Sequence, residues 1–482
     1  MQKSNDVTVV VGTAWRFMER ICAQVVTFAV SIVLARLLSP DEYGMIALVS
    51  VFVTIANVFV SDGLASALIQ KKEVDSLDYS TVLYGGLLIS ILLYLVFFLL
   101  SPLVGMFYDM PILTPVLRVL LLRIPLAAIN SVEAAYLSRR LEFKKFFWAT
   151  LGGTLFSGVV GVIMAYNHMG IWSLVGQNLS NYTIDVIILA FVIKKIPPPK
   201  ISLSRMRVLF SFGGKILATN LVFQLINQLR VLIIGKKYSA ASLSFYNEGF
   251  RFSNLIGQNI AAPLSSVLFP TLSKMQNDLS EIKAFLRKTI RMLSFVISPM
   301  LMGLAAISSS LIPWLLTDKW LPAVPFVWFG AIYNSFTVLH GTNLEAVKAI
   351  GAGDQVFKYG NIKRMIGLAS LLLTFWISVE AMAVGMILSA VICTLVNVYQ
   401  NKRLFSYSYR EQVHDFGRNM LASWIMCAVT FFVGKRLPFG NFITMIIQIC
   451  IGIMVYLGLS IVLCKDTLRS IISIMPKTKK GT

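Results

Sequence analysis

Long apolar segments alternate with short polar ones along the whole chain, and this pattern predicts a membrane protein built from helices. A transmembrane helix needs about 20 mostly apolar residues, and separating the apolar runs at their charged or Pro/Gly-rich breaks gives about fourteen such segments. We expect them near residues 13–35, 44–68, 81–101, 115–137, 147–167, 171–193, 208–235, 244–270, 286–311, 323–347, 363–379, 381–401, 419–435 and 441–464.

Polar side chains form a stripe on each of the first two expected helices. Because they recur every three or four residues, each stripe occupies one face of its helix. The first stripe consists of Arg16, Arg20, Gln24, Thr27 and Ser31. The second consists of Ser50, Thr54, Asn57 and Ser61, with Asp62 beside it.

A similar pair of stripes returns in the middle of the chain. Its members are Asn220, Gln224 and Asn227, followed by Asn247, Arg251, Asn254 and Gln258. The turn Ser239–Ala240–Ala241 stands where Ser39–Pro40–Asp41 stood in the first pair. Two helical halves that each carry a polar face are typical of a transporter built from parallel repeats around a central cavity.

The composition places the chain in a lipid bilayer. Hydrophobic residues make up 57% of it and charged residues only 13%, which is too apolar for a soluble globular protein. The formal net charge of +21 comes from basic clusters such as Lys71–Lys72 and Arg139–Arg140, which fall mostly on one expected side of the membrane. Such sorting marks the cytoplasmic side, so both termini are expected there and nucleic-acid binding is not expected.

A proline-rich segment at residues 194–200, Lys-Lys-Ile-Pro-Pro-Pro-Lys, is the best candidate for a linker, because it is too stiff and polar for a membrane helix. Six helices are expected before it. The predicted organisation is therefore an N-terminal six-helix lobe (1–200), a C-terminal six-helix lobe (201–412), and two further helices with a cytoplasmic tail (413–482).

The sequence offers no sign of an enzyme, a metal site or a cofactor. No expected loop exceeds about 25 residues, which leaves no room for a soluble catalytic domain of usual size. His168, His340 and His414 are far apart, and no nucleotide-binding or nucleophile motif occurs. The five cysteines are scattered singly through apolar runs and are expected to be packing residues.

The notable chemistry is charge inside the expected membrane helices. A charge at that depth costs roughly 2.5–3.5 kcal/mol on insertion scales, so it should face a wet cavity or another charge. Arginine suits an anionic substrate, because guanidinium binds phosphate oxygens bidentately and stays protonated. The substrate-binding candidates are Arg16, Arg20, Gln24, Asn57, Arg123, Asn220, Gln224, Arg230, Asn247, Arg251 and Asn254. The candidates for coupling to an ion gradient are the carboxylates Asp62, Glu133, Asp185 and Glu248.

Structural explanations compete with several of these assignments. Arg16 is near a helix end, so reaching the membrane interface explains it equally well. Glu248 and Arg251 are three residues apart on one helical face and could form a private ion pair. The Asn and Gln stripes could hydrogen-bond between helices, which is the commoner use of such residues.

Several stretches resemble a known family. They are Ala35-Arg36-Leu37-Leu38-Ser39-Pro40-Asp41-Glu42-Tyr43-Gly44, residues 63–72 (Gly-Leu-Ala-Ser-Ala-Leu-Ile-Gln-Lys-Lys), Arg139-Arg140-Leu141-Glu142-Phe143, residues 245–272, and Asp318-Lys319-Trp320-Leu321-Pro322. In combination, over nearly the whole chain, they resemble the Wzx-type polysaccharide flippases of the multidrug/oligosaccharidyl-lipid/polysaccharide exporter superfamily.

The resemblance implies an all-helical fold of two MATE-like six-helix lobes forming a V-shaped cavity, plus two C-terminal helices associated with the lipid tail of the substrate. It implies a protein of the bacterial cytoplasmic membrane that moves undecaprenyl-diphosphate-linked oligosaccharide between leaflets, for O-antigen, capsule or exopolysaccharide. Expected partners are this lipid-linked substrate and membrane lipids, with a polysaccharide polymerase and a chain-length regulator as further candidates. The alternatives are a same-fold exporter of drugs or of lipid-linked peptidoglycan precursor and, less favoured, an integral-membrane polysaccharide polymerase.

Overall fold

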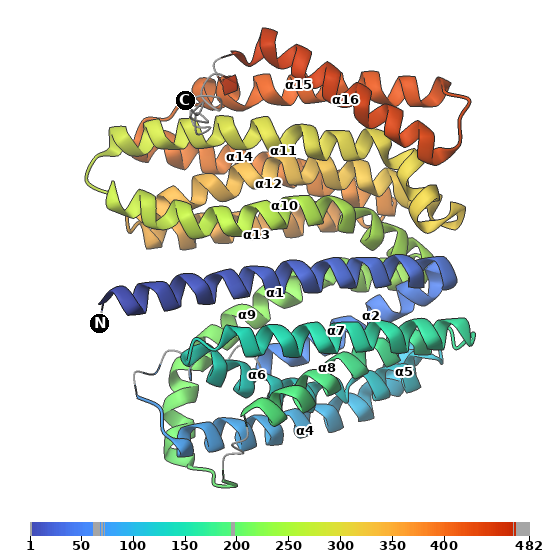
Figure 1. The fold of residues 1–482 in the computed structure, drawn as a ribbon, viewed down its shortest axis with the longest axis vertical. Helices are drawn as coiled ribbons and strands as arrows, with labels where there is room; N and C mark the ends of the chain where they lie inside the picture. Colours follow the sequence, from blue (N-terminus) through green and yellow to red (C-terminus); the bar gives the residue numbers. More distant parts are fainter. Residues whose placement is uncertain are drawn as a thin grey trace, which may run out of the picture. The chain divides into compact units, whose positions relative to one another are not determined.

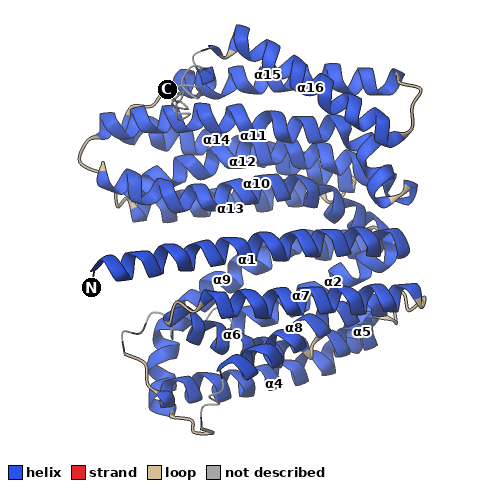
Figure 2. Ribbon diagram, viewed as in Figure 1, coloured by secondary structure: helices blue, strands red, loops and turns tan. Residues whose placement is uncertain are grey.

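The structure, a computed structural model, is built from α-helices (Figures 1 and 2), as the sequence predicts. It describes residues 2–60, 68, 71, 73–193, 198–465 and 467–468, and no strand occurs among them. The chain divides into two compact units, Met1–Ser244 and Phe245–Thr482. Asp62 and residues 194–197 of the expected linker lie outside the described residues.

The helices of the first unit occupy the positions expected from the apolar segments, except that the segment expected at 115–137 is divided into two helices, α5 and α6. They are α1 (Gln2–Leu37), α2 (Pro40–Asn57), α4 (Ser76–Phe107), α5 (Leu113–Leu120), α6 (Arg123–Arg139), α7 (Phe143–Tyr166), α8 (Ile171–Ile193) and α9 (Leu203–Lys237). α7 packs against both α1 and α8, and α6 packs between α4 and α8. α9 packs on α2 and α4, which is why it belongs to this unit.

The turn before α2 is fixed by its own sequence. Ser39 is the N-cap, and its Oγ accepts a hydrogen bond from the Glu42 backbone N–H at 3.4 Å. The Glu42 carboxylate accepts the Ser39 backbone N–H at 2.6 Å in return, which completes a capping box. Pro40 occupies the first helical turn, where its missing N–H costs nothing.

The two turns that the repeat pattern relates lie against each other in the first unit. The carboxylate of Asp41 accepts the backbone N–H of Ala241 at 3.2 Å. A Cβ on Gly44 would lie 1.8 Å from the carbonyl oxygen of Ala240, so only glycine allows this approach. Gly235 similarly makes room for Leu48, since a Cβ there would lie 2.2 Å from a Leu48 methyl group.

The second unit is organised around the long helix α11. Its helices are α10 (Ala240–Lys274, which begins in the first unit), α11 (Leu279–Leu316), the 3₁₀ turn η2 (Asp318–Ala323), α12 (Val324–Ala349), α13 (Gly353–Thr374), α14 (Val379–Phe405), α15 (Tyr409–Arg436) and α16 (Asn441–Leu463). α11 packs against α12, α15 and α16, while α14 packs against α12 and α13.

The last two helices are joined to α11 by an apolar core and by polar contacts. The core includes Met302 of α11, Met426 of α15 and Tyr456 of α16. The Tyr456 hydroxyl donates to the carbonyl oxygen of Phe295 at 2.7 Å. The pair α15–α16, which falls outside the two sets of six, is therefore an integral part of the second unit.

Among the described residues, eleven helical segments are long and apolar enough to cross a membrane. Of the remaining long helices, α8, α10 and α13 span 23, 35 and 22 residues but are not among these eleven. Polar residues explain the lower hydropathy, for example Asp185 in α8 and Arg251 in α10. The count of fourteen spans and the domain boundaries at residues 200 and 412 stay predictions.

Candidate functional site

Arg123 is the best-defined candidate in the first unit. It opens α6, and two of its guanidinium nitrogens donate to α8, to the Asn178 side-chain oxygen at 3.3 Å and to the Tyr182 hydroxyl at 2.7 Å. The guanidinium also lies 4.2 Å from the centre of the Tyr182 ring. No carboxylate lies within ion-pair distance of Arg123 among the described residues, so its positive charge is not neutralised there.

Arg16 has a different environment, because it is anchored between helices. It forms an ion pair with Glu19 at 3.4 Å and donates to the Ser138 hydroxyl at 3.1 Å. Its guanidinium lies 4.3 Å from the centre of the Phe146 ring. These contacts tie α1 to α6 and α7, and they favour the structural explanation for Arg16.

Two of the predicted coupling carboxylates lie half-buried in the first unit. Oε2 of Glu133 and Oδ1 of Asp185 are buried and have no hydrogen-bond partner among the described residues. Gly153 of α7 makes room for Asp185, because a Cβ there would lie 1.9 Å from its Oδ1. A buried carboxyl oxygen without a partner is costly, which is a mark of a functional group.

Glu133 also lines a cavity of about 650 Å³ formed by α4, α6 and α8. Its walls include the aromatic residues Tyr79, Tyr84 and Tyr136, with Arg140 also in the lining. The carboxyl group is therefore both embedded and next to open space, as a group that exchanges an ion requires.

The remaining candidates of the first unit lie on α1, α2 and α9. Arg20 is exposed on the surface of the unit, while Gln24, Asn57, Asn220, Gln224 and Arg230 are partly buried. The side-chain oxygen of Asn57 and Nε of Arg230 are buried without a partner among the described residues. Nε of Arg123 is likewise buried without a partner among the described residues, but its other two guanidinium nitrogens donate to α8.

The second unit contains both structural features given above as alternatives, the ion pair of Glu248 with Arg251 and a hydrogen bond between helices from the Asn/Gln stripe. Arg251 donates from Nη1 to both oxygens of Glu248 at 3.2 Å, so the private ion pair exists. The side-chain oxygen of Asn254 accepts from Asn334 of α12 at 3.0 Å, so this amide also links two helices. Asn247 is half-buried one turn before Arg251.

Sequence reasoning missed a buried polar group between α12, α13 and α14. Nζ of Lys363 lies 3.3 Å from Nε2 of His340 and donates to the Asn397 side-chain oxygen at 3.0 Å. Within the described part of the chain Lys363 has no carboxylate partner. Lys363 begins the expected helix 363–379 and counts there as part of a cytoplasmic basic cluster, and its partners, 23 and 34 residues away, could not be paired from spacing alone.

The two units thus carry polar groups inside helical bundles, as a transporter requires. A family model described as "Polysaccharide biosynthesis protein" matches residues 33–325, which is more than half of the chain. The chain belongs to this polysaccharide biosynthesis family. The match confirms the resemblance given by the turn before α2 and the stretches that follow it.

Relatives of this chain align with it over most of their own length. The succinoglycan biosynthesis transport protein ExoT of Rhizobium meliloti is 25% identical and aligns with 99% of this chain and 97% of its own. The lipopolysaccharide biosynthesis protein WzxC of Escherichia coli is 21% identical, over 79% of this chain and 78% of its own. ExoT is named as a transport protein, which agrees with the prediction of a transporter and not an enzyme.

Solved structures confirm the fold of this family member. The lipid II flippase MurJ in an inward closed conformation superposes with a TM-score of 0.75 at 18% identity, covering 95% of this chain and 100% of its own. An inward-facing multidrug resistance MATE family transporter of the MOP superfamily gives a TM-score of 0.63 at 12% identity, covering 80% and 94%. The fold is therefore that of the MurJ and MATE transporters.

Proposed function

We propose that this chain is a flippase that moves undecaprenyl-diphosphate-linked oligosaccharide across the bacterial cytoplasmic membrane by alternating access. The product would serve O-antigen, capsule or exopolysaccharide synthesis, and both termini would be cytoplasmic. Family membership and the similarity to ExoT over nearly the whole chain support the substrate class. The sorting of basic clusters such as Lys71–Lys72 supports the orientation.

The observation that carries the proposal is the charge of Arg123. The diphosphate of such a substrate must leave water to cross the membrane, so it needs a cation in the protein. Arg16 and Arg251 each have a carboxylate partner, whereas Arg123 donates hydrogen bonds to the neutral groups of Asn178 and Tyr182. An embedded cation held by neutral groups retains its charge for an anionic ligand.

Variants of Arg123 test this role. Arg123→Lys keeps the charge but loses the planar fork, and Arg123→Ala removes both, so we expect reduced and abolished transport respectively. Arg118 on α5 is the matched control, because its guanidinium also lies in the first unit, 2.8 Å from the Ser101 hydroxyl. Transport would be measured in proteoliposomes as arrival of a fluorescent undecaprenyl-diphosphate oligosaccharide in the outer leaflet.

The same assay also tests the alternative substrates. Faster movement of lipid II or of a cationic drug than of the oligosaccharide lipid would replace the proposed substrate with that compound. Formation of polymer from the lipid-linked sugar by the pure protein would instead indicate a polymerase. Equal loss of transport in Arg118→Ala and Arg123→Ala would remove Arg123 from the proposed site.

Two further parts of the proposal concern coupling and partners. Asp62, Glu133, Asp185 and Glu248 would carry the coupling ion, and the unpartnered oxygens of Glu133 and Asp185 support this. A polysaccharide polymerase and a chain-length regulator would associate with the chain in the membrane. Crosslinking in membranes, followed by identification of the captured proteins, tests that association.

A further inference from the structure

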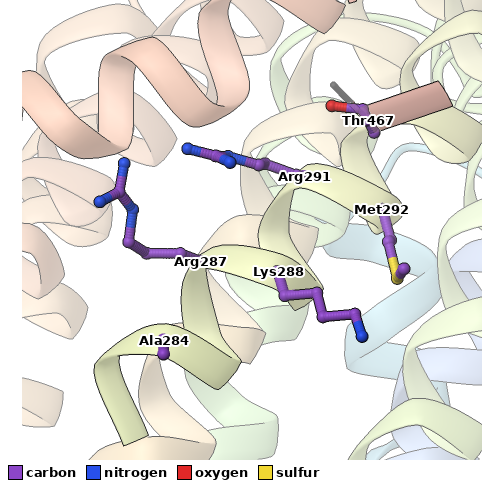
Figure 3. Close-up of a pocket in the computed structure, with 6 residues that line it drawn as sticks. All are labelled: Ala284, Arg287, Lys288, Arg291, Met292 and Thr467. Carbon is purple, nitrogen blue, oxygen red and sulfur yellow. The ribbon is translucent and has the colours of Figure 1, made fainter. Parts of the chain in front are cut away.

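A basic pocket lies at the beginning of α11, and none of its lining residues belongs to the polar groups described above. It has a volume of about 310 Å³ and is lined by Ala284, Arg287, Lys288, Arg291, Met292 and Thr467. Figure 3 shows the guanidinium groups of Arg287 and Arg291 extending toward one side of α11 and the ammonium group of Lys288 toward the other. Five of the lining residues recur at intervals of three or four along α11, so they share one broad side of the helix, with the arginines and Lys288 at its opposite edges.

The two arginines are held in place by α15. Nε of Arg287 donates to the Asp415 carboxylate at 2.8 Å, and Nε of Arg291 donates to the same carboxylate at 2.6 Å. The Tyr407 hydroxyl donates to this carboxylate at 2.9 Å as well. Asp415 therefore positions both guanidinium groups and leaves each with further N–H donors.

Positive charge exceeds negative charge around the pocket. Lys283 and Arg287 share the carboxylate of Glu411, while Arg287 and Arg291 share that of Asp415. Lys288 is exposed and has no ion pair among the described residues.

A row of apolar residues, half-buried at Met292 and exposed beyond it, continues from the pocket along α11. Met292, Val296 and Met300 follow Lys288 at intervals of four residues, and Val296 and Met300 are 48% and 47% exposed. At 1.5 Å per residue, the 38 residues of α11 extend roughly 57 Å, nearly twice the hydrocarbon thickness of a bilayer. α11 must therefore project beyond the hydrocarbon core, and the span expected at residues 286–311 would place Lys288 near the headgroups and the apolar row at acyl-chain level.

We propose that this pocket binds the headgroup of an anionic membrane phospholipid, such as phosphatidylglycerol or cardiolipin, whose acyl chains lie along Met292, Val296 and Met300. Basic pockets between helices on the cytoplasmic side of membrane proteins take such headgroups. The volume is at the small end of the range for ligand pockets, and no aromatic or amide side chain is among the six lining residues. The site therefore suits a phosphate–glycerol group better than an oligosaccharide.

Lipid-dependent stability of the purified full-length protein tests the site without requiring transport, so its result is independent of the proposed function. We expect phosphatidylglycerol and cardiolipin to raise the unfolding temperature in detergent and phosphatidylethanolamine to have little effect. Lys288→Ala should weaken the apparent affinity for phosphatidylglycerol roughly fivefold, and Lys288→Glu more than about tenfold. Lys402→Glu is the matched control, because Lys402 is an exposed lysine of α14 that does not line the pocket.

Four outcomes would overturn the proposal. They are equal stabilisation by phosphatidylethanolamine, equal loss of affinity in Lys288→Glu and Lys402→Glu, an equal Lys288-dependent shift with inorganic phosphate alone, and a Lys288-dependent shift only with undecaprenyl diphosphate. Equal loss of affinity in the two glutamate variants would indicate an effect of general surface charge. A shift with inorganic phosphate alone would indicate a site for soluble phosphate, and a shift only with undecaprenyl diphosphate would indicate a substrate site.

Discussion

The ion pair between Glu248 and Arg251 allows the structural and the recognition roles of an embedded arginine to be separated. The Glu248 side chain is 11% exposed and that of Arg251 is 31% exposed, and they lie 3.2 Å apart. Arg251→Ala leaves a nearly buried carboxylate without this partner. Breaking a buried pair from one side costs roughly 3–5 kcal/mol, and we expect about 3 because the pair is partly open to solvent on the Arg251 side.

The double variant Glu248→Ala/Arg251→Ala removes both charges, so most of that loss of stability should return. If Arg251 also serves as a substrate ligand, as its place on the polar stripe predicts, transport should not return with stability, because the guanidinium is still missing. Arg251→Lys should be intermediate, since lysine keeps the charge and loses the fork. Thermal unfolding in detergent, membrane abundance and export of surface polysaccharide would be measured for every variant.

The same single and double alanine variants of Arg16 and Glu19 are the control. These two residues are also three positions apart on one helix, and their charged groups lie 3.4 Å apart. Arg16 also has the Ser138 hydroxyl and two aromatic rings as partners, so we expect a stability effect with little effect on transport. Full rescue of transport by Glu248→Ala/Arg251→Ala would refute a role of Arg251 in binding the diphosphate.

Four more predictions concern packing, pH, coupling and topology. Gly44→Ala should prevent accumulation of folded protein, because the new Cβ would lie 1.8 Å from the Ala240 carbonyl oxygen. Gly341→Ala is the control, since a Cβ there meets nothing within 4 Å. Equal membrane abundance of the two variants would contradict the close approach at Gly44. The hydrogen bond from Arg205 lowers the pKa of Asp75 to about 2 from 3.8. This contact should therefore stabilise the protein above about pH 4, and the stabilisation should be lost as the pH falls toward 2. The same dependence of the unfolding temperature on acid pH in Asp75→Asn would argue against it. Replacing the proposed coupling residues singly by their amides should abolish ion-dependent transport in at least one variant, and unchanged ion dependence in all four, Asp62, Glu133, Asp185 and Glu248, would rule out carboxylate coupling. Cysteine labelling should place Lys71 and Lys480 on the same side of the membrane, and labelling from opposite sides would disprove the fourteen-span topology.

The sequence by itself determined the class of fold and the position of most helices. Apolar length is a local property, and a bilayer allows each segment to be assigned without knowing its neighbours. The turn before α2 was equally readable, because Ser39, Pro40 and Glu42 make their capping contacts within four residues of one another. The residues of the repeat were visible for the same reason.

Which polar residue is neutralised, and by what, was decided only by the tertiary structure. Arg123 and Arg16 look alike in sequence, yet one is held by neutral groups 55 and 59 residues away and the other by an adjacent carboxylate and a hydroxyl 122 residues away. Lys363 contacts His340 only because α12 and α13 pack together. The energy of a buried charge depends on the groups within a few ångströms of it, and helix packing brings those groups from distant parts of the chain.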